Sequence, residues 1–144
     1  MRRLKLAVGL GLAGLIPFWA LALAYVTGQA FGYGRPEVSF ALSAYAATIA
    51  SFLGGIRWGF AVSDKLQAWA RFDYVISVVP QLVSWAALLL DGRPRFLILA
   101  TVLLVSGPAD YRLVTRGSAP LWFGRLRVVL SLLASASLLV AAAV

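Results

Sequence analysis

The sequence predicts an all-α integral membrane protein with five transmembrane helices, and two observations lead to this prediction. Of the 144 residues, 62% are hydrophobic and 12% are charged, whereas a soluble domain has roughly 45–50% apolar and about 25% charged residues. The charged residues also gather in short joints between long uncharged runs, as expected of segments that cross a bilayer. The predicted spans of this single membrane domain cover residues 6–26, 38–62, 74–90, 96–109 and 122–144.

The first two spans are separated by a joint rich in glycine. Residues 6–26 follow a short basic head, and this run is longer than the apolar core of roughly 7–15 residues in a signal peptide, so we expect a retained helix. The second span, residues 38–62, contains one charged residue, Arg57, close to its end. A long arginine side chain near a helix end can reach the lipid phosphates, so we expect Arg57 to lie at the headgroups.

The remaining three spans differ in how clearly the sequence defines them. Residues 74–90 form the third span, and the short joint after it requires the fourth span to return antiparallel beside it. The fourth span, residues 96–109, is the weakest, because Asp110 ends it early and Gly107-Pro108 is a helix-breaking pair. We expect a short or kinked span there, with a re-entrant segment as the alternative. Residues 122–144 form the fifth span.

The distribution of lysine and arginine predicts the orientation of the chain. In the five-span arrangement, the side of the N-terminus carries Arg2, Arg3, Lys5, Arg57, Lys65, Arg71, Arg112, Arg116, Arg125 and Arg127. The other side carries only Arg35, Arg93 and Arg95. The positive-inside rule therefore places the N-terminus in the cytoplasm and Val144 outside. Because no Arg- and Ser-rich transit segment precedes the first span, we expect a bacterial cytoplasmic (inner) membrane.

Several classes of activity lack the residues that they need. Histidine and cysteine are both absent, which removes thiol nucleophiles, imidazole bases and the usual ligands of zinc, haem and iron–sulfur clusters. All acidic residues lie in joints or at the ends of the predicted spans, so a proton-coupled carrier and a paired-carboxylate hydrolase are not expected. The net charge of +8 follows the orientation signal, so we expect no nucleic acid. We predict no enzyme activity, no cofactor and no metal.

Small side chains recur every four residues along the second predicted span, at Ser43, Ala47, Ser51, Gly55 and Gly59. We call this set the small-residue ridge. Small residues at this spacing let helix backbones approach closely in a bilayer. We expect the ridge to pack against neighbouring helices of the same chain. A homo-oligomer contact, or the wall of a lipid or ligand groove, is the alternative.

The third predicted span carries a polar stripe formed by Ser77, Pro80, Gln81 and Ser84. Spacings of three and four residues place the two serines and Gln81 on one helix face, with Gln81 near the middle of the bilayer. Pro80 lacks an amide hydrogen and therefore frees a carbonyl oxygen beside this stripe. Hydrogen bonding between helices is the first interpretation. The lining of a hydrated pocket or path is the alternative.

A group of charged and aromatic residues is expected on the cytoplasmic side, at Arg57, Trp58, Asp110, Trp122, Arg125 and Arg127. Residues of these types ordinarily anchor helices at the headgroups. The alternative is a site for an anionic headgroup or ligand. In such a site, Arg57, Arg125 and Arg127 would hold the anion, with Asp73 or Asp110 as their partners.

Three stretches resemble those of a family of uncharacterised membrane proteins that includes bacterial proteins and the mitochondrial transmembrane protein 69 of animals. They are SFLGGIRWG at residues 51–59, SVVPQLVSW at residues 77–85 and PLWFGRLR at residues 120–127. The resemblance covers nearly the whole chain and departs from the family pattern at Phe123 and Ser131, where tyrosine and threonine are preferred. It implies a multi-pass membrane fold and no known activity.

From these observations we expect a small membrane protein of unknown activity that acts as a non-enzymatic accessory or assembly module. Such a module presents helix surfaces to another membrane protein or to a second copy of itself. The alternative function is binding or transport of a lipid or small amphiphile through the polar stripe and the cytoplasmic arginines. The lipid bilayer is the one partner that both functions require.

Overall fold

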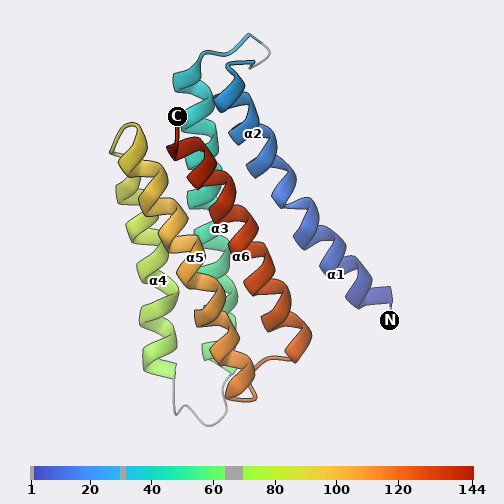
Figure 1. Ribbon diagram of the computed structural model, residues 1–144. Helices are drawn as coiled ribbons and strands as arrows, with labels where there is room; N and C mark the ends of the chain where they lie inside the picture. The colour runs from blue at the N-terminus through green and yellow to red at the C-terminus, as the bar shows by residue number, and fades with distance from the viewer. Residues whose placement is uncertain (1, 30–31, 64–69) are drawn as a thin grey trace.

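The computed structural model describes residues 2–29, 32–63 and 70–144, and within these ranges every regular element is an α-helix. The helices are α1 (Arg2–Ala13), α2 (Leu15–Thr27), α3 (Arg35–Ser63), α4 (Ala70–Ala87), α5 (Arg93–Thr115) and α6 (Leu121–Ala142). Figure 1 shows them as long antiparallel rods, with the N-terminus and the C-terminus at opposite ends of the bundle. The all-helical membrane fold predicted from the composition is therefore confirmed.

The first predicted span consists of two consecutive helices at one edge of the bundle. α1 ends and α2 begins on either side of Gly14, although Gly14 itself keeps helical dihedral angles. Pro17 has no amide hydrogen to continue the helical hydrogen-bond pattern here. The Tyr45 hydroxyl of α3 donates a hydrogen bond to the Gly14 carbonyl oxygen over 2.9 Å. This hydrogen bond connects the junction between α1 and α2 to the neighbouring helix α3.

Four segments of the described residues are long and apolar enough to cross a membrane. They are Leu4–Thr27, Arg35–Ser63, Arg93–Thr115 and Leu121–Ala142. α4 is not among them, and the reason is its composition, because Arg71, Asp73 and Gln81 lower its mean hydropathy. It still runs along α3 and α5 (Figure 1) and contacts both. Arg71 and Asp73 precede the third predicted span, residues 74–90, which itself carries no charged residue.

The fourth predicted span is longer than expected. α5 continues without interruption through Gly107 and Pro108 to Thr115, instead of ending at residue 109. A Cβ atom at Gly107 would lie 2.9 Å from the Ser131 Cβ atom of α6. Gly107 therefore permits close packing of α5 on α6 and does not break the helix, which corrects the interpretation of Gly107-Pro108. Asp110 consequently lies inside a helix and not in a joint.

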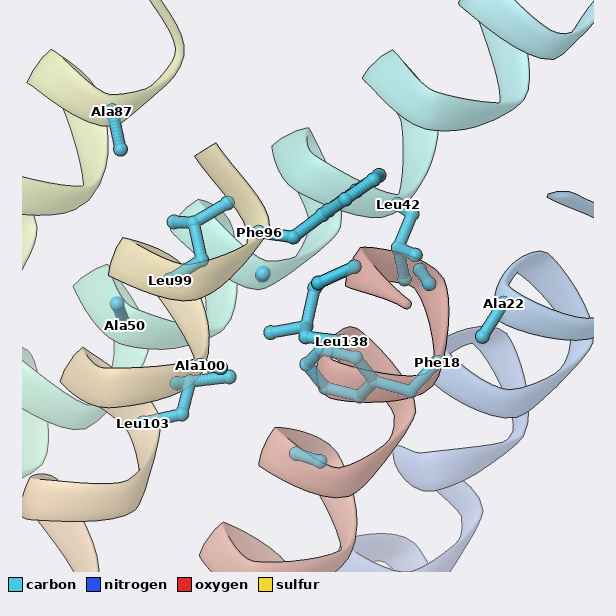
Figure 2. Packing of buried hydrophobic residues seen from close by; sticks show 14 of the residues in the cluster. Phe18, Ala22, Leu42, Ala50, Ala87, Phe96, Leu99, Ala100, Leu103 and Leu138 are labelled. Carbon is cyan, nitrogen blue, oxygen red and sulfur yellow. The ribbon is translucent and has the colours of Figure 1, made fainter. Parts of the chain in front are cut away.

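The apolar core lies between α2, α3, α5 and α6 and is built from a few large side chains among many alanines (Figure 2). Phe18 of α2, Leu42 of α3, Phe96 of α5 and Leu138 of α6 are each at most 1% exposed. Alanines of neighbouring turns fill the space around these four side chains, which brings the helices close together. This core holds the bundle in the half that lies nearer the C-terminus of α6.

Large apolar side chains also cover the outside of the bundle. Leu6, Ile16, Phe52, Trp85 and Leu89 are each more than 60% exposed. A soluble protein rarely exposes contiguous apolar surface on this scale, because contact between apolar surface and water is unfavourable. The bundle is therefore apolar both inside and outside, as a bilayer requires.

Candidate functional site

Four helices meet at a buried cluster of charged side chains, and this cluster is the main polar feature of the interior. Arg57 of α3 donates from Nη1 to Asp73 of α4 and from Nη2 to Asp110 of α5, both over 2.9 Å. Arg127 of α6 donates from Nε to the second oxygen of Asp110 over 2.7 Å. We call Arg57, Asp73, Asp110 and Arg127 the charge cluster.

The charge cluster lies inside the bundle and not at its surface. Its four residues are between 3% and 6% exposed. Arg57, Asp110 and Arg127 lie five or six residues from the nearest end of their helices, which corresponds to roughly 8–9 Å along the helix axis. Arg116 is less buried and contacts Asp73 from the edge of the cluster, at 3.4 Å. The expectation that Arg57 reaches the lipid headgroups is therefore wrong.

The energetics of the charge cluster depend on the completeness of its pairing. Removing charges from water costs several kcal/mol per ion, and mutual attraction repays this cost only when the geometry is good. Here the two positive and two negative side chains balance, and each carboxylate accepts hydrogen bonds from arginines on other helices. Such a cluster contributes little net stability, but loss of one member leaves a buried charge without a partner and costs about 3–5 kcal/mol.

The predicted cytoplasmic-face group separates into two sets. Arg57, Asp110 and Arg127 meet in the charge cluster, whereas Trp58, Trp122 and Arg125 are exposed. The Trp58 ring packs edge-on against Tyr74 with 4.7 Å between ring centroids. The prediction that an aspartate pairs with these arginines agrees with the geometry. The six residues nevertheless do not form one site, because three of them are buried in the charge cluster and three are exposed.

A cavity of about 340 Å³ lies between α3, α4 and α5, beside the charge cluster. Most of its wall is apolar and includes Leu53, Ile76, Val79 and Val105. Along α5 its lining residues run from Thr101 to Arg112, which spans roughly 16 Å of helix. The charged lining residues, Arg57, Asp110 and Arg112, all lie at the end nearest the charge cluster. We call this space the large cavity, and it is apolar along its length and charged at one end.

A smaller cavity of about 140 Å³ is lined by residues of α1, α2, α3, α5 and α6. We call it the small cavity. Arg127 and Ser131 line it, and within the described residues neither Arg127 Nη2 nor Ser131 Oγ has a hydrogen-bond partner. The charge cluster therefore lies beside both cavities, because Arg57 and Asp110 line the large cavity and Arg127 lines the small cavity.

The polar stripe predicted on the third span does not form one face. Ser77 and Ser84 are buried, whereas Gln81 is exposed on the outer surface of α4. The Ser77 hydroxyl donates to the Tyr74 carbonyl oxygen within the same helix, over 2.6 Å. Pro80 lines the large cavity. Of the four predicted residues, Pro80 alone lines the large cavity or the smaller one described above.

The small-residue ridge is also not a single packing line. Ser43 is buried, Ala47 and Ser51 are half-buried, and Gly55 and Gly59 are exposed. A Cβ atom at either glycine would meet nothing within 4 Å. The expectation that the whole ridge packs within the chain is therefore wrong.

The closest approach of α3 and α4 is made by Gly54, which sequence analysis did not single out. A Cβ atom there would overlap the Ser77 carbonyl oxygen of α4 and lie 3.2 Å from the Ser77 carbonyl carbon. The backbones of the two helices are therefore in direct contact at this point. This contact brings Asp73, one turn before Ser77, within reach of Arg57.

Comparison with known proteins gives one family. The family model described as "Protein of unknown function (DUF3429)" matches residues 4–143. Transmembrane protein 69 of Xenopus tropicalis is 42% identical over 141 residues, covering 93% of this chain and 52% of that protein. Transmembrane protein 69 of Mus musculus is 36% identical over 139 residues, covering 94% of this chain and 55% of that protein.

The chain thus spans about half the length of the curated relatives that it matches. No solved structure matches it. The three stretches that carry the resemblance contribute directly to the site, since they contain Gly54, Arg57, Ser77 and Arg127.

Proposed function

We propose that this chain, which belongs to the DUF3429 family of proteins of unknown function, binds a single-chain anionic amphiphile in the large cavity between α3, α4 and α5. The family and its relatives support a multi-pass membrane protein and indicate no characterised activity. The proposal therefore rests on one observation, which is the amphipathic character of the large cavity. Its volume of about 340 Å³ lies within the usual range of roughly 300–1,000 Å³ for ligand sites.

The apolar wall of the large cavity supports binding of a hydrocarbon tail. Leu53, Val79, Val83 and Val105 come from three different helices and line one continuous space. Burial of a tail against such residues is favourable by roughly 25 cal/mol per Å² relative to water. Within a bilayer this gain is small, so the charged end of the cavity must distinguish the ligand from ordinary lipid.

Arg112 is the group that we assign to the headgroup. It is exposed at the charged end of the large cavity, and it forms no ion pair with any described residue. Arg57 and Asp110 are neutralised by the charge cluster and close the cavity toward the core. An arginine near the membrane surface attracts an anionic headgroup by about 1 kcal/mol. In this proposal the protein binds the amphiphile and catalyses no reaction on it.

This proposal orients the chain as the positive-inside rule does, with the charge cluster and Arg112 toward the cytoplasm. We place the protein in a bacterial cytoplasmic membrane, where a single-chain anionic amphiphile reaches the large cavity laterally from the cytoplasmic leaflet. Phe72 and Arg112 lie at this end of the large cavity and are exposed, which supports entry there.

The test uses a long-chain fatty acid that carries a photoreactive diazirine in its tail. In membranes containing the wild-type chain, we expect labelling of peptides from α4 and α5. Ala109→Phe places a large ring in the large cavity and is expected to lower the labelling at least about tenfold, the equivalent of roughly 1.4 kcal/mol. Arg112→Gln is expected to lower it about fivefold, since it removes about 1 kcal/mol of headgroup attraction.

The matched control is Ala86→Phe, because Ala86 is exposed on the outer surface of α4 and does not line the large cavity. It is expected to leave the labelling unchanged. Circular dichroism establishes that each variant is folded, and Val105→Phe serves as a second filling variant if Ala109→Phe is not. Equal labelling of a folded filling variant and the wild-type chain would contradict the proposal.

A second candidate function is the interaction module, and one observation favours it. Gly55 and Gly59 form a G-x-x-x-G pair that lies exposed on α3, with open space above both residues. In membranes such a pair permits close contact with another helix. Because the chain has no cysteine, Gly55→Cys reports such a contact directly by disulfide formation. Dimers with Gly55→Cys and none with Ala86→Cys would support it, whereas monomers with both would count against it.

A further inference from the structure

We propose that the N-terminus of α5 binds a phosphate group, with Nη1 of Arg95 and the backbone N–H groups of the first helical turn as donors. Figure 1 shows the start of α5 at the end of the bundle that holds the C-terminus of the chain. Arg95 and Arg112 lie toward opposite ends of α5, roughly 26 Å apart along the helix axis. The phosphate site is therefore separate from the charged end of the large cavity, and either site can exist without the other.

The first turn of α5 presents backbone N–H groups that no side chain caps. Gly92 is the N-cap residue, and among the described residues none caps this helix end through its side chain. Gly92 has φ of 67° and ψ of −145°, a conformation that is essentially restricted to glycine, so a capping residue such as serine does not fit here. Pro94 has no N–H group, which leaves those of Arg93 and Arg95 without an acceptor inside the helix. Such N–H groups and the helix dipole together attract an anion.

The buried guanidinium of Arg95 is directed at the same helix end. Arg95 is 6% exposed, and its Nη2 atom donates to the Ser39 hydroxyl of α3 over 2.6 Å, which holds the guanidinium in place. Its Nη1 atom lies 3.7 Å from Oδ1 of Asp91, the residue before the N-cap. The side chain therefore runs back past the start of α5, and at this distance Nη1 makes no hydrogen bond with Asp91.

Nη1 is the nitrogen of Arg95 that an external anion can reach. The Nε atom is enclosed and has no hydrogen-bond partner in the described part of the chain, so a ligand cannot contact it. Nη1 is not enclosed in this way, and the Asp91 side chain beside it is fully exposed. A phosphate oxygen can therefore approach Nη1 from the side on which Asp91 lies.

The charge of Arg95 is not neutralised inside the bundle. Its one ion pair with a described residue is the contact with Asp91, and solvent screens a pair whose partner is exposed. Arg57 and Arg127, in contrast, have buried aspartates as counter-ions. A buried cation without a buried counter-ion is strongly unfavourable, and at a helix N-terminus it also opposes the helix dipole. An anion at Nη1 relieves both effects.

Phosphate is the anion that this arrangement fits. Its oxygens accept hydrogen bonds from a guanidinium and from backbone N–H groups at the same time. A phospholipid headgroup and free inorganic phosphate share this chemistry. Leu89 and Leu97 lie on either side of the start of α5 in the sequence and are 73% and 38% exposed, so apolar surface that meets the bilayer adjoins the phosphate site.

The experiment measures the thermal unfolding midpoint of the full chain in micelles of dodecyl maltoside, a detergent without phosphate. Sodium phosphate is compared with sodium chloride at equal ionic strength, and phosphatidylglycerol is compared with diacylglycerol. We expect phosphate in at least one form to raise the midpoint at saturation by about 5 °C over its comparison. A rise with phosphatidylglycerol alone identifies a lipid headgroup as the ligand, whereas a rise with sodium phosphate shows that free phosphate suffices.

Two variants test the phosphate site, and a third is the matched control. Arg95→Gln removes the Nη1 donor and is expected to abolish the rise. Asp91→Asn removes the competing carboxylate and is expected to lower the phosphate concentration at half effect about threefold. Because Asp91 is exposed, this variant tests the site even if Arg95→Gln does not fold. Arg93→Gln is the control, since Arg93 is exposed and its side chain points roughly 200° away around the helix; it is expected to retain the rise.

Three results would overturn the proposal. The first is a midpoint that neither form of phosphate raises above its comparison. The second is a folded Arg95→Gln variant with the same rise as the wild-type chain, because phosphate then acts elsewhere on the protein. The third is an Asp91→Asn variant that needs as much phosphate as the wild-type chain or more, because Asp91 is then a structural partner of Arg95 and not a competitor. Photolabelling of the large cavity in Arg95→Gln is expected to remain unchanged, which separates these results from failure of the proposed function.

Discussion

The pairing of Arg57 with Asp110 across α3 and α5 predicts a large energetic coupling between these two residues. Arg57→Met removes both donors that hold Asp73 and Asp110, and leaves two buried carboxylates with fewer partners. Asp110→Asn removes the counter-ion that Arg57 shares with Arg127. Each single substitution is expected to cost about 3–5 kcal/mol of unfolding free energy, since each leaves buried charge unpaired. Arg57 and Asp110 share one direct contact of 2.9 Å. Each single substitution removes this contact, so adding the two single costs counts its loss twice.

The double variant is therefore expected to be more stable than the sum of the single costs, by about 2–3 kcal/mol. The assay is reversible unfolding in mixed micelles, followed by far-ultraviolet circular dichroism, for the wild-type chain, both single variants and the double variant. Arg125→Met with Asp110→Asn provides the control pair, because Arg125 is exposed and its effect should add to that of Asp110 within about 0.5 kcal/mol. Additive costs for Arg57 and Asp110 would refute the charge cluster.

Two further predictions concern the contacts that set the helix positions. Gly54→Ala forces a methyl group into the Ser77 backbone and is expected to lower the free energy of unfolding by about 2 kcal/mol, after a gain of about 1 kcal/mol in helix propensity. Gly55→Ala has open space around it and should raise the free energy of unfolding by up to about 1 kcal/mol in the same assay. A Gly55→Ala variant less stable than Gly54→Ala would contradict the α3–α4 contact. Tyr45→Phe removes the hydrogen bond to Gly14 and is expected to cost about 1 kcal/mol, which unfolding in mixed micelles measures; no change would show that this bond does not stabilise the break between α1 and α2.

The fold was predictable because composition and the spacing of charges reflect the solvent directly. The uncharged runs of the chain have to meet lipid, and this requirement needs no knowledge of tertiary contacts. One exception is α5, whose end the sequence places before Asp110, on the assumption that a carboxylate does not enter a membrane helix. That assumption fails because Arg57 and Arg127 come from other helices to neutralise Asp110, and sequence order alone does not bring them together.

The candidate site was predicted in part, and helix geometry explains the errors. A step of four residues turns an α-helix by roughly 40° beyond a full turn. The small-residue ridge therefore winds from Ser43, which is buried, to Gly59, which is exposed, while Gly54 makes the closest contact with α4. Gln81 is displaced from Ser77 by the same angle and lies on the outer surface. Residue spacing therefore predicts a shared helix face only when the rotation that accumulates along the helix is taken into account.

Native mass spectrometry of the detergent-extracted protein tests the central claim, that the large cavity holds an amphiphile, most directly. We expect the wild-type chain to retain a bound species with the mass of a single-chain anionic amphiphile, and Ala109→Phe to lose that species while Ala86→Phe retains it. A wild-type chain without any bound species, or one whose bound species persists unchanged in folded Ala109→Phe, would contradict the account.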